Sequence, residues 1–246
     1  MKIAVTMPGK IGDALYALPT IRHLYKTTGA VIDFYTSHYC APIVSLFEYQ
    51  SCVNKVIIPE NYVIERMDMG VQPWEMPVES GYDVIHHLGF RGIPNTALHQ
   101  YMATQIGINE PLAVEYEVPL PLECGVVVPE KPYICLATRG FTTFLGLFNE
   151  VSDRFTTCII GASGEYMGHG LDYTGLSLLQ TASLLSKSVG FVGLMSSQLV
   201  LANGFDIPRV APHDGGSWDM SHVVVYHRNF YPVHPSADEV IRLLGV

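Results

Sequence analysis

The 246-residue sequence lacks several features that would assign it to a membrane or secreted class. It holds no run of about 18 or more apolar residues, so we expect no membrane-spanning segment. Pro8, Gly9, Lys10 and Asp13 interrupt the apolar N-terminal stretch, which is therefore not typical of a signal peptide. The five cysteines are an odd number and form no CxxC pair, which argues against a disulfide framework or a zinc site. These absences favour a cytoplasmic protein with reduced thiols.

Positive charge is also scarce. The chain has 14 lysines and arginines against 23 acidic residues, which gives a formal net charge of −9. Sequence-independent binding of nucleic acid needs a basic surface, so this balance argues against it. A small anionic ligand held by a few local donors remains compatible with this composition.

Familiar catalytic motifs are missing too. The sequence contains no D-x-D, no Walker A lysine motif, no H-E-x-x-H, no nucleophile elbow and no Cys–His signature. Neighbouring residues on a strand point to opposite faces, so His86 and His87 are poorly placed to share one ion. His213-Asp214 is an isolated pair. We therefore predict neither a metal site nor a metal cofactor.

The strongest local pattern lies in residues 2–28. Lys2–Met7 is a short apolar run with β-branched residues, and it predicts a buried strand that ends before Pro8-Gly9. After Gly12, apolar side chains recur at helical spacing, which predicts a helix. Pro19 lies deep inside that helix, where proline removes a hydrogen bond, and such departures from local rules tend to occur at functional sites.

Asp13 stands at the start of this helix and has two interpretations. It is either an N-cap, whose side-chain oxygen accepts a backbone N–H bond and favours the helix dipole, or a catalytic carboxylate. The second interpretation follows from its position, because ligands of open α/β sheets bind at the carboxyl ends of strands. The local sequence leaves both open.

Strand and helix patterns alternate along the rest of the chain, which predicts parallel βαβ units and an α/β fold. Prolines between positions 119 and 132 surround Cys124-Gly125 and suggest a domain boundary. We therefore predict two Rossmann-like domains, residues 1–125 and 126–246, that face each other across a cleft. The expected strands are 31–36, 55–59, 81–88, 133–137, 156–160, 189–192 and 209–211, and the expected helices are 39–48, 96–106, 177–187, 196–203 and one that begins at Ser236.

The stretch G-K-I-G-D-A-L-Y-A-L-P-T-I-R-H-L resembles the opening of the ADP-heptose:lipopolysaccharide heptosyltransferases, glycosyltransferase family 9. Their first strand is followed by the signature G-D-x-(3)-x-L-P-x-(2)-x-L, which is matched here by Gly12, Asp13, Leu18, Pro19 and Leu24. The resemblance implies the GT-B arrangement of two Rossmann-like domains, an N-terminal acceptor-side domain and a C-terminal nucleotide-sugar-binding domain. It also implies that Asp13 is the general base.

A second stretch, G-F-V-G-L-M-S-S-Q-L-V-L-A-N-G, resembles the donor-phosphate motif of that family, V-G-N-D-S-G-P-x-H-x-A. Gly193, Ser196 and Ala202 match it, whereas the Asp, Gly and His positions are occupied by Met195, Ser197 and Val200. From the residues alone, Ser196 and Ser197 are either ordinary N-caps or donors to a diphosphate at a helix N-terminus.

The resemblance implies further donor-binding residues. Thr138, Arg139, Thr142 and Thr143 follow the first strand of the second half, where the family places Thr and Lys or Arg side chains against donor phosphates. A guanidinium such as that of Arg139 suits phosphate oxygens, although a solvated surface arginine is the alternative. Gly161–Glu165 resembles the family's G-x-x-x-E, in which the carboxylate accepts hydrogen bonds from a nucleoside ribose.

The leading hypothesis is a metal-independent, inverting glycosyltransferase that uses a nucleotide-diphosphate sugar as co-substrate. Asp13 would deprotonate the acceptor hydroxyl, and Gly12 with the residues of the second half would bind the donor. The alternatives are a virus-encoded transferase that glycosylates a modified nucleobase in DNA, a nucleotide-sugar epimerase of the GT-B type, and a non-catalytic nucleotide-sugar binder. Met195 and Val200 favour the binder. The sequence indicates neither the donor base, nor the acceptor, nor the oligomeric state.

Overall fold

The computed structural model describes residues 1–60, 62, 75–89, 96–138, 143–166, 169–215 and 228–246. These residues form two compact units, which divide between Glu117 and Val118 rather than after residue 125. The segment 118–125 belongs to the second unit because Ser183 and Gln180 of that unit donate hydrogen bonds to the carbonyls of Pro119 and Cys124, at 2.7 and 2.9 Å. Among the described residues, no helix combines the length and the apolar character of a membrane span.

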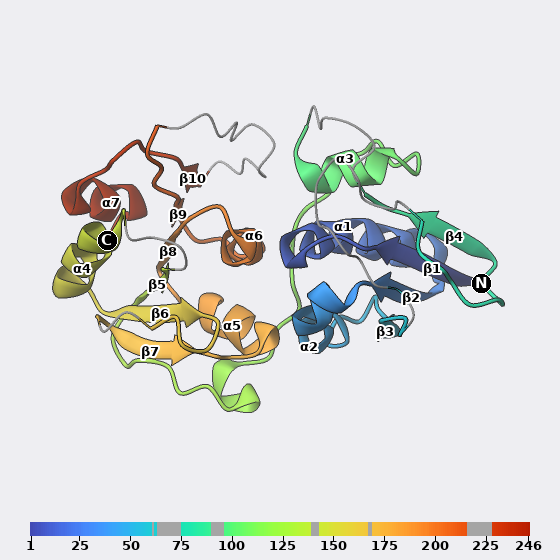
Figure 1. Cartoon of the computed structure of the whole chain (residues 1–246), viewed down its shortest axis with the longest axis horizontal. Coiled ribbons are helices and arrows are strands. Elements are labelled where there is room, and N and C mark those ends of the chain that lie inside the picture. The colour runs from blue at the N-terminus through green and yellow to red at the C-terminus, as the bar shows by residue number, and fades with distance from the viewer. Residues whose placement is uncertain (61, 63–74, 90–95, 139–142, 167–168, 216–227) are drawn as a thin grey trace. The chain divides into compact units, whose positions relative to one another are not determined.

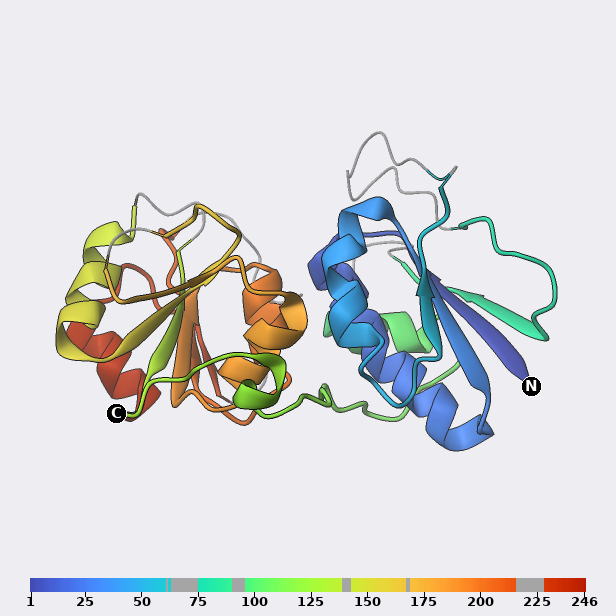
Figure 2. The same ribbon diagram turned by 90° about the horizontal axis from the view of Figure 1, so that it is seen from below.

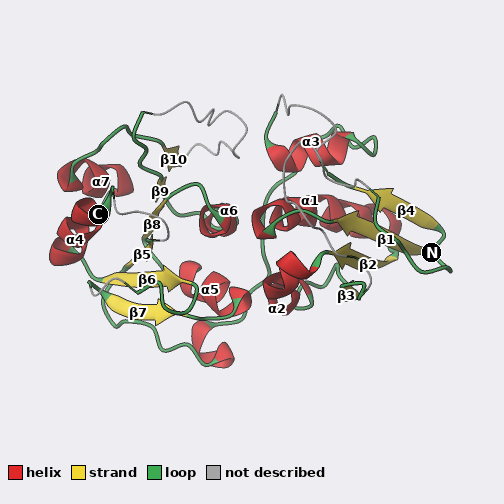
Figure 3. Ribbon diagram, viewed as in Figure 1, coloured by secondary structure: helices red, strands yellow, loops and turns green. Residues whose placement is uncertain are grey.

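The first unit contains a four-stranded sheet of β1 (Lys2–Met7), β2 (Val31–Thr36), β3 (Lys55–Ile57) and β4 (Val84–His87). Its order is β3-β2-β1-β4, and every neighbouring pair is parallel. The helical elements of the unit are α1 (Ile11–Thr28), the 3-10 helix η1 (His38–Ile43), α2 (Val44–Phe47) and α3 (Leu98–Thr104) (Figure 3).

Helix α1 forms as its apolar spacing predicts. Leu15, Leu18 and Ile21 recur on one face and are completely buried. Pro19 lies inside the helix. The helix ends at Gly29, whose φ of 63° is the left-handed conformation that glycine adopts without penalty, and its N–H donates to the Tyr25 carbonyl at 2.9 Å.

The two faces of the first sheet are covered differently. Phe34 of β2 packs on Phe47 of α2, with ring centroids 4.9 Å apart, so this face meets the helices (Figure 2). The next residue, Tyr35, points to the opposite face and packs against Tyr82, in the segment before β4. That second face carries a smaller apolar cluster around Ala4, Tyr35 and Met76.

The second unit contains a six-stranded parallel sheet in the order β10-β9-β8-β5-β6-β7. Counted within the unit from β7, this is the strand order 3-2-1-4-5-6 of the doubly wound nucleotide-binding fold. The strands are β5 (Ile134–Ala137), β6 (Thr157–Gly161), β7 (Leu171–Thr174), β8 (Gly190–Gly193), β9 (Arg209–Val210) and β10 (Asn229–Phe230).

Helices lie on both faces of this second sheet. In Figure 1, α4 (Leu145–Arg154) and α7 (Ala237–Leu244) cover one face, and α5 (Leu178–Leu185) and α6 (Ser197–Ala202) cover the other. The core under α4 and α7 includes Phe148, Val151 and Val240. The 3-10 helix η2 (Pro121–Cys124) precedes β5. Both units therefore have the α/β architecture that the sequence predicts.

Most predicted elements are confirmed, and the differences have local causes. The predicted helix 39–48 is a 3-10 helix followed by one turn of α-helix, with Pro42 inside its first part. Helix α4 was not predicted, because Gly146 and Asn149 weaken its helical pattern. Strand β7 was missed because it lies at the sheet edge, where Leu171 and Asp172 are exposed.

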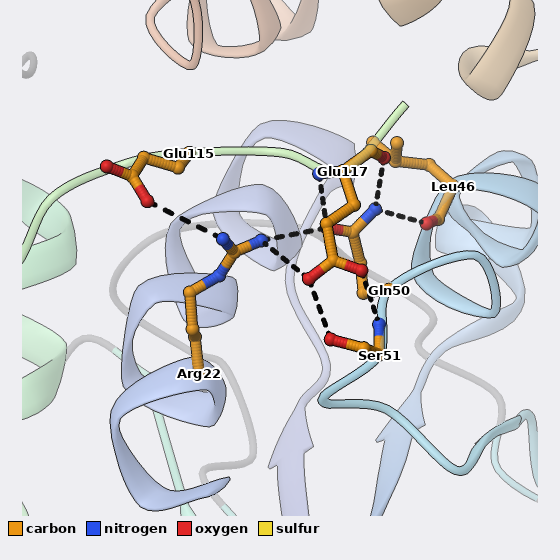
Figure 4. Close-up of polar contacts among 6 residues, drawn as sticks. All are labelled: Arg22, Leu46, Gln50, Ser51, Glu115 and Glu117. Atoms are coloured by element: carbon orange, nitrogen blue, oxygen red, sulfur yellow. Dashed lines mark hydrogen bonds and ion pairs between the residues drawn. The ribbon is translucent and has the colours of Figure 1, made fainter. Parts of the chain in front are cut away.

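The end of the first unit is held by a buried amide. Gln50, which is 1% exposed, donates from Nε2 to the carbonyls of Leu46 and Glu117, and its Oε1 accepts the N–H of Glu117 at 2.9 Å (Figure 4). Arg22 donates to the same Oε1 at 3.0 Å and pairs with Glu115 and Glu117 at 3.6 and 3.8 Å. The last residues of the unit are therefore anchored before the chain crosses to the second unit.

Candidate functional site

The strand order of each unit identifies one edge where a ligand is expected. In the first unit, β1 lies between β2 and β4, so the chain moves outward in one direction and then returns to the other side of β1. In the second unit, β5 lies between β6 and β8 in the same way. Ligands of such sheets bind outside the carboxyl ends of the strands where the order reverses. The residues that follow β1, β4, β5 and β8 are therefore the ones to consider.

Asp13 lies in the first turn of α1, directly after β1. The N-cap of this helix is Lys10, with extended backbone (φ −89°, ψ 172°), so the interpretation of Asp13 as the N-cap is wrong by three residues. Asp13 is the third helical residue, and its Oδ2 accepts the backbone N–H of Lys10 at 2.9 Å. A carboxylate in the first turn of a helix also interacts favourably with the helix dipole. Gly12 precedes it in the same turn.

The environment of Asp13 changes its ionisation. The side chain is partly buried, and this desolvation raises the pKa of the Asp13 carboxyl above its usual value, although the Lys10 backbone N–H and the Lys10 charge act in the opposite direction. A raised pKa makes the carboxylate a stronger base. A carboxyl that is held by the backbone and has such a pKa is a candidate for proton abstraction.

Gly9 packs directly against Asp13, a contact that the sequence pattern does not predict. A Cβ atom at Gly9 would lie 2.7 Å from both the Cβ and the Oδ2 of Asp13, and 2.8 Å from the Cε of Met7. The backbone therefore passes against the Asp13 carboxylate at a distance that only glycine allows. Its signal in the sequence was the Pro8-Gly9 turn, which predicted the end of the strand but not this contact.

At the end of β4, His87 contacts β1. Its Nδ1 lies 2.9 Å from the Oγ1 of Thr6, which is completely buried. Burial lowers the pKa of the neighbouring His86, and the nearby His87 lowers it further. In the part of the chain that the structure describes, no group of three or more His, Cys, Asp or Glu side chains is placed to hold a metal ion.

In the second unit, two of the predicted donor residues are in contact. Thr138, directly after β5, is 5% exposed and donates from its hydroxyl to the carbonyl of Glu165 at 3.3 Å. The Glu165 carboxylate accepts the N–H of Ala162 at 2.8 Å and so closes the turn after β6. A Cβ at Gly161 would lie 2.5 Å from Oε2 of Glu165, so a larger residue here would displace the carboxylate that closes the turn.

Gly193 brings the end of β8 close to the end of β5. It pairs in register with Ala137, and a Cβ at Gly193 would lie 2.9 Å from the Cβ of Ala137. Thr138 follows β5 directly, and Ser196 lies three residues after the end of β8. Two predicted donor residues from separate motifs therefore follow paired strands at the same edge of the sheet. Sequence spacing alone does not establish this pairing.

Ser196 occupies the N-cap position of α6 with extended backbone, but its side chain makes no capping hydrogen bond. Its Oγ is buried and has no hydrogen-bond partner in the structure as described. Ser197 is the first helical residue, and its hydroxyl donates to Gln198 Oε1 at 3.2 Å. The interpretation of Ser196 as an ordinary side-chain cap is therefore wrong.

The remaining predicted residues have mixed outcomes. Thr143 is exposed in the turn before α4, while Arg139 and Thr142 lie outside the described residues. Met195 is partly exposed, and Val200 is buried in α6 with 8% of its surface exposed.

The chain was compared with known sequences and solved structures. No protein-family model and no curated protein sequence matches the chain. Solved structures do: the ADP-heptose lipopolysaccharide heptosyltransferase II of E. coli matches with a TM-score of 0.70 and 15% identity, over 100% of this chain and 98% of that one. The chain has the fold of the heptosyltransferases.

Two further structures have the same heptosyltransferase-like fold. A glycosyl transferase of family 9 from Veillonella parvula matches with a TM-score of 0.68 and 12% identity, over 98% of this chain and 88% of that one. TibC of enterotoxigenic E. coli, an iron-containing dodecameric glycosyltransferase, matches with a TM-score of 0.66 and 18% identity, over 95% of this chain and 65% of that one. The predicted resemblance to glycosyltransferase family 9 and the predicted fold class are confirmed at the level of the fold.

Proposed function

We propose that this chain is a glycosyltransferase that moves a sugar from a nucleotide-diphosphate donor to a hydroxyl acceptor, with inversion and without a metal ion. One observation carries the proposal. Asp13 is partly buried, is held by the backbone N–H of Lys10, and lies at the carboxyl edge of β1 in a fold shared with heptosyltransferases.

In this mechanism, Asp13 accepts the proton of the acceptor hydroxyl. The acceptor oxygen forms a bond to the anomeric carbon while the bond between that carbon and the diphosphate oxygen breaks. The nucleoside diphosphate leaves with the electron pair, and attack from the side opposite the leaving group inverts the anomeric configuration. A carboxyl with a raised pKa is suited to this step because it holds the transferred proton more firmly.

The donor is assigned to the second unit, which begins at Val118, and the acceptor to the first unit, which ends at Glu117. The buried and unpartnered hydroxyl of Ser196, after β8, and the buried Thr138, after the paired strand β5, support a diphosphate position at the β5–β8 edge. The proposed donor residues are Gly12, Thr138, Arg139, Thr142, Thr143, Glu165, Ser196 and Ser197. An adenosine diphosphate sugar is the first donor to test, because the E. coli relative is described as acting with ADP-heptose.

Donor binding is tested by thermal shift with ADP, UDP, GDP, CDP and dTDP, with and without Mg²⁺. A ligand that binds only the folded protein raises the Tm. We expect one diphosphate to raise the Tm equally with and without Mg²⁺, and Arg139→Ala to weaken that shift. Lys131→Ala is the control, since Lys131 is also a cation but precedes β5. If no diphosphate shifts the Tm, the donor assignment is wrong.

The role of Asp13 is tested with Asp13→Asn, which keeps an oxygen that can accept the Lys10 N–H but cannot take a proton. Loss of a general base lowers turnover by about 10²–10⁴-fold. We expect this loss in a transfer assay with a sugar conjugate of the nucleoside diphosphate that raises the Tm, with nucleotide binding unchanged. Equal turnover by the wild-type and variant proteins would refute the assignment of the base.

A non-catalytic nucleotide-sugar binder is the second candidate. Val200 is buried in α6 where the donor motif of the family has a histidine, so this position offers no polar group to a ligand. A Tm shift by one diphosphate, together with no turnover by the wild-type protein on any hydroxyl acceptor, supports the binder over the transferase.

A further inference from the structure

We propose that Cys40 and Ser37 are positioning residues for the Asp13 carboxylate and act through the peptide unit that joins Gly9 to Lys10. The proposal rests on the proposed function of Asp13 as the general base. Neither residue belongs to the motifs from which the site was predicted, and both come from the segment that follows β2.

The carbonyl end of this peptide unit accepts hydrogen bonds from side chains of the segment after β2. The Gly9 carbonyl oxygen accepts a hydrogen bond from the Cys40 thiol at 3.0 Å and a longer one from the Ser37 hydroxyl at 3.4 Å. Both side chains are completely buried. Thr36 adds a third contact, since its hydroxyl donates to the Met7 carbonyl at 2.8 Å. The end of β2 therefore holds the backbone that leaves β1.

The amide end of the same peptide unit contacts the catalytic carboxylate. The Lys10 N–H donates to Oδ2 of Asp13 at 2.9 Å. A trans peptide is planar, so its C=O and N–H bonds point in opposite directions. Fixing the Gly9 carbonyl toward Cys40 therefore directs the Lys10 N–H toward Asp13.

Gly9 makes this arrangement tight. A Cβ at this position would lie 2.7 Å from the Asp13 carboxylate, so the carboxylate is packed directly on the peptide unit that Cys40 holds. A rotation of this peptide would move the N–H away from Oδ2 and turn the carbonyl oxygen toward a negative charge. The carboxylate would lose a donor and gain a repulsive neighbour.

The Cys40 thiol is suited to a permanent donor role. Burial raises the pKa of Cys40 to about 11, and the Asp13 charge acts in the same direction. The thiol therefore stays protonated at neutral pH and keeps its S–H for the Gly9 carbonyl. Lys10 and Cys40 both interact electrostatically with Asp13, so the titration of Asp13 reports on this group of residues.

The test compares Cys40→Ala with Cys40→Ser and with a matched control, Cys52→Ala. Cys52 is a buried thiol of the same unit, 2% exposed, so its loss creates a similar cavity away from Gly9. The readout is the pH titration of the Lys10 backbone amide, followed by NMR of the ¹⁵N-labelled full chain. Asp13→Asn identifies the titrating group, because its Lys10 amide shift should no longer change with pH in the carboxyl range.

We expect Cys40→Ala to raise the titration midpoint by roughly half a pH unit to one unit, since one hydrogen bond to the charged form is weakened. Cys40→Ser should restore the wild-type midpoint, and Cys52→Ala should leave it unchanged. In the transfer assay, the acid limb of the kcat profile should move by the same amount. A wild-type midpoint in Cys40→Ala, or an equal shift in Cys52→Ala, overturns the proposal.

A second variant and a readout that needs no substrate complete the test. If Cys40→Ala does not fold, Ser37→Ala removes the weaker donor to the same carbonyl and should produce a smaller shift in the same direction, whereas no shift counts against the proposal. The amide titration needs no substrate. Full turnover by Asp13→Asn therefore refutes the proposed general base, while the titration still decides whether Cys40 and Ser37 position Asp13.

Discussion

At the scale of single residues, Gly9 lets the backbone after β1 pass directly against the Asp13 side chain. An added Cβ would lie 2.7 Å from the carboxylate, well inside normal packing distance. We expect Gly9→Ala to push Asp13 out of its position. Overpacking of this kind costs about 1–3 kcal/mol of unfolding free energy, measured by urea denaturation, and turnover should fall with it.

The control for this prediction is Gly146→Ala in α4, where an added Cβ meets no atom within 4 Å. Alanine is favoured over glycine inside a helix by about 1 kcal/mol, so this variant should be slightly more stable than the wild type. If Gly9→Ala is as stable and as active as the wild type, the packing of Asp13 on this backbone is not required.

At the scale of elements, a buried carboxylate joins β2 to its neighbours. Asp33 is completely buried and accepts hydrogen bonds from Tyr82 at 2.6 Å and Asn54 at 2.7 Å, with Lys2 Nζ at 3.3 Å. Burial by itself would raise the pKa of Asp33, but these three partners outweigh it and the pKa lies below its usual value. Asp33 thus ties the segment before β4 to the sheet face that carries the cluster around Ala4, Tyr35 and Met76.

This lowered pKa has a definite consequence for stability against pH. Because the folded-state pKa lies below the unfolded one, the contribution of Asp33 is complete above the unfolded value, near 4, and is lost as the pH falls through the folded value. We expect Asp33→Asn to destabilise the protein by about 1–3 kcal/mol at pH 7, with a smaller difference at about pH 3, in urea denaturation.

Asp153→Asn is the matched control, since it removes the same charge from an exposed position on α4. It should change the unfolding free energy by about 0.5 kcal/mol or less. A destabilisation by Asp33→Asn that is equal at both pH values would show that the ionised form contributes nothing specific.

At the scale of the whole molecule, the crossing between the two units is anchored on each side. Gln50 binds both the N–H and the carbonyl of Glu117 in the first unit (Figure 4). In the second unit, Ser183 donates a hydrogen bond to the carbonyl of Pro119. Val118 lies between these anchors. We expect Gln50→Leu to release residues 115–117, because the apolar leucine side chain leaves both backbone groups of Glu117 unpaired.

The measurement is limited proteolysis with a glutamyl endopeptidase, with the products identified by mass spectrometry. Cleavage after Glu115 and Glu117 should be several-fold faster in Gln50→Leu than in the wild type. Gln100→Leu is the control. The Gln100 amide also forms hydrogen bonds with the backbone, at the Glu110 carbonyl and the Leu112 N–H rather than at Glu117. Equal acceleration in both variants would show general destabilisation rather than release of the crossing.

The local sequence was sufficient for elements whose signal lies within a few residues. Strands β1 and β2 coincide with their apolar runs, and α7 begins after the predicted cap Ser236, whose Oγ accepts the Glu239 N–H at 3.2 Å. Such signals are complete within one turn or one strand, so no distant residue is needed to interpret them. The prediction that Asp13 is a site residue arose in the same way, from its place in the Gly-Asp…Leu-Pro motif.

The tertiary structure decided what surrounds that residue. Cys40 reaches Gly9 across 31 positions of sequence, because parallel pairing of β1 with β2 brings the ends of these strands to one edge of the sheet. The contact of Thr138 with Glu165, 27 positions apart, likewise depends on the pairing of β5 with β6. The sequence by itself determined the fold class, most of its elements and the position of Asp13. Only the tertiary structure decided which side chains hold the Gly9–Lys10 peptide beside the carboxylate. The pairing of β1 with β2 brings these residues together, and their separation in sequence carries no periodic signal.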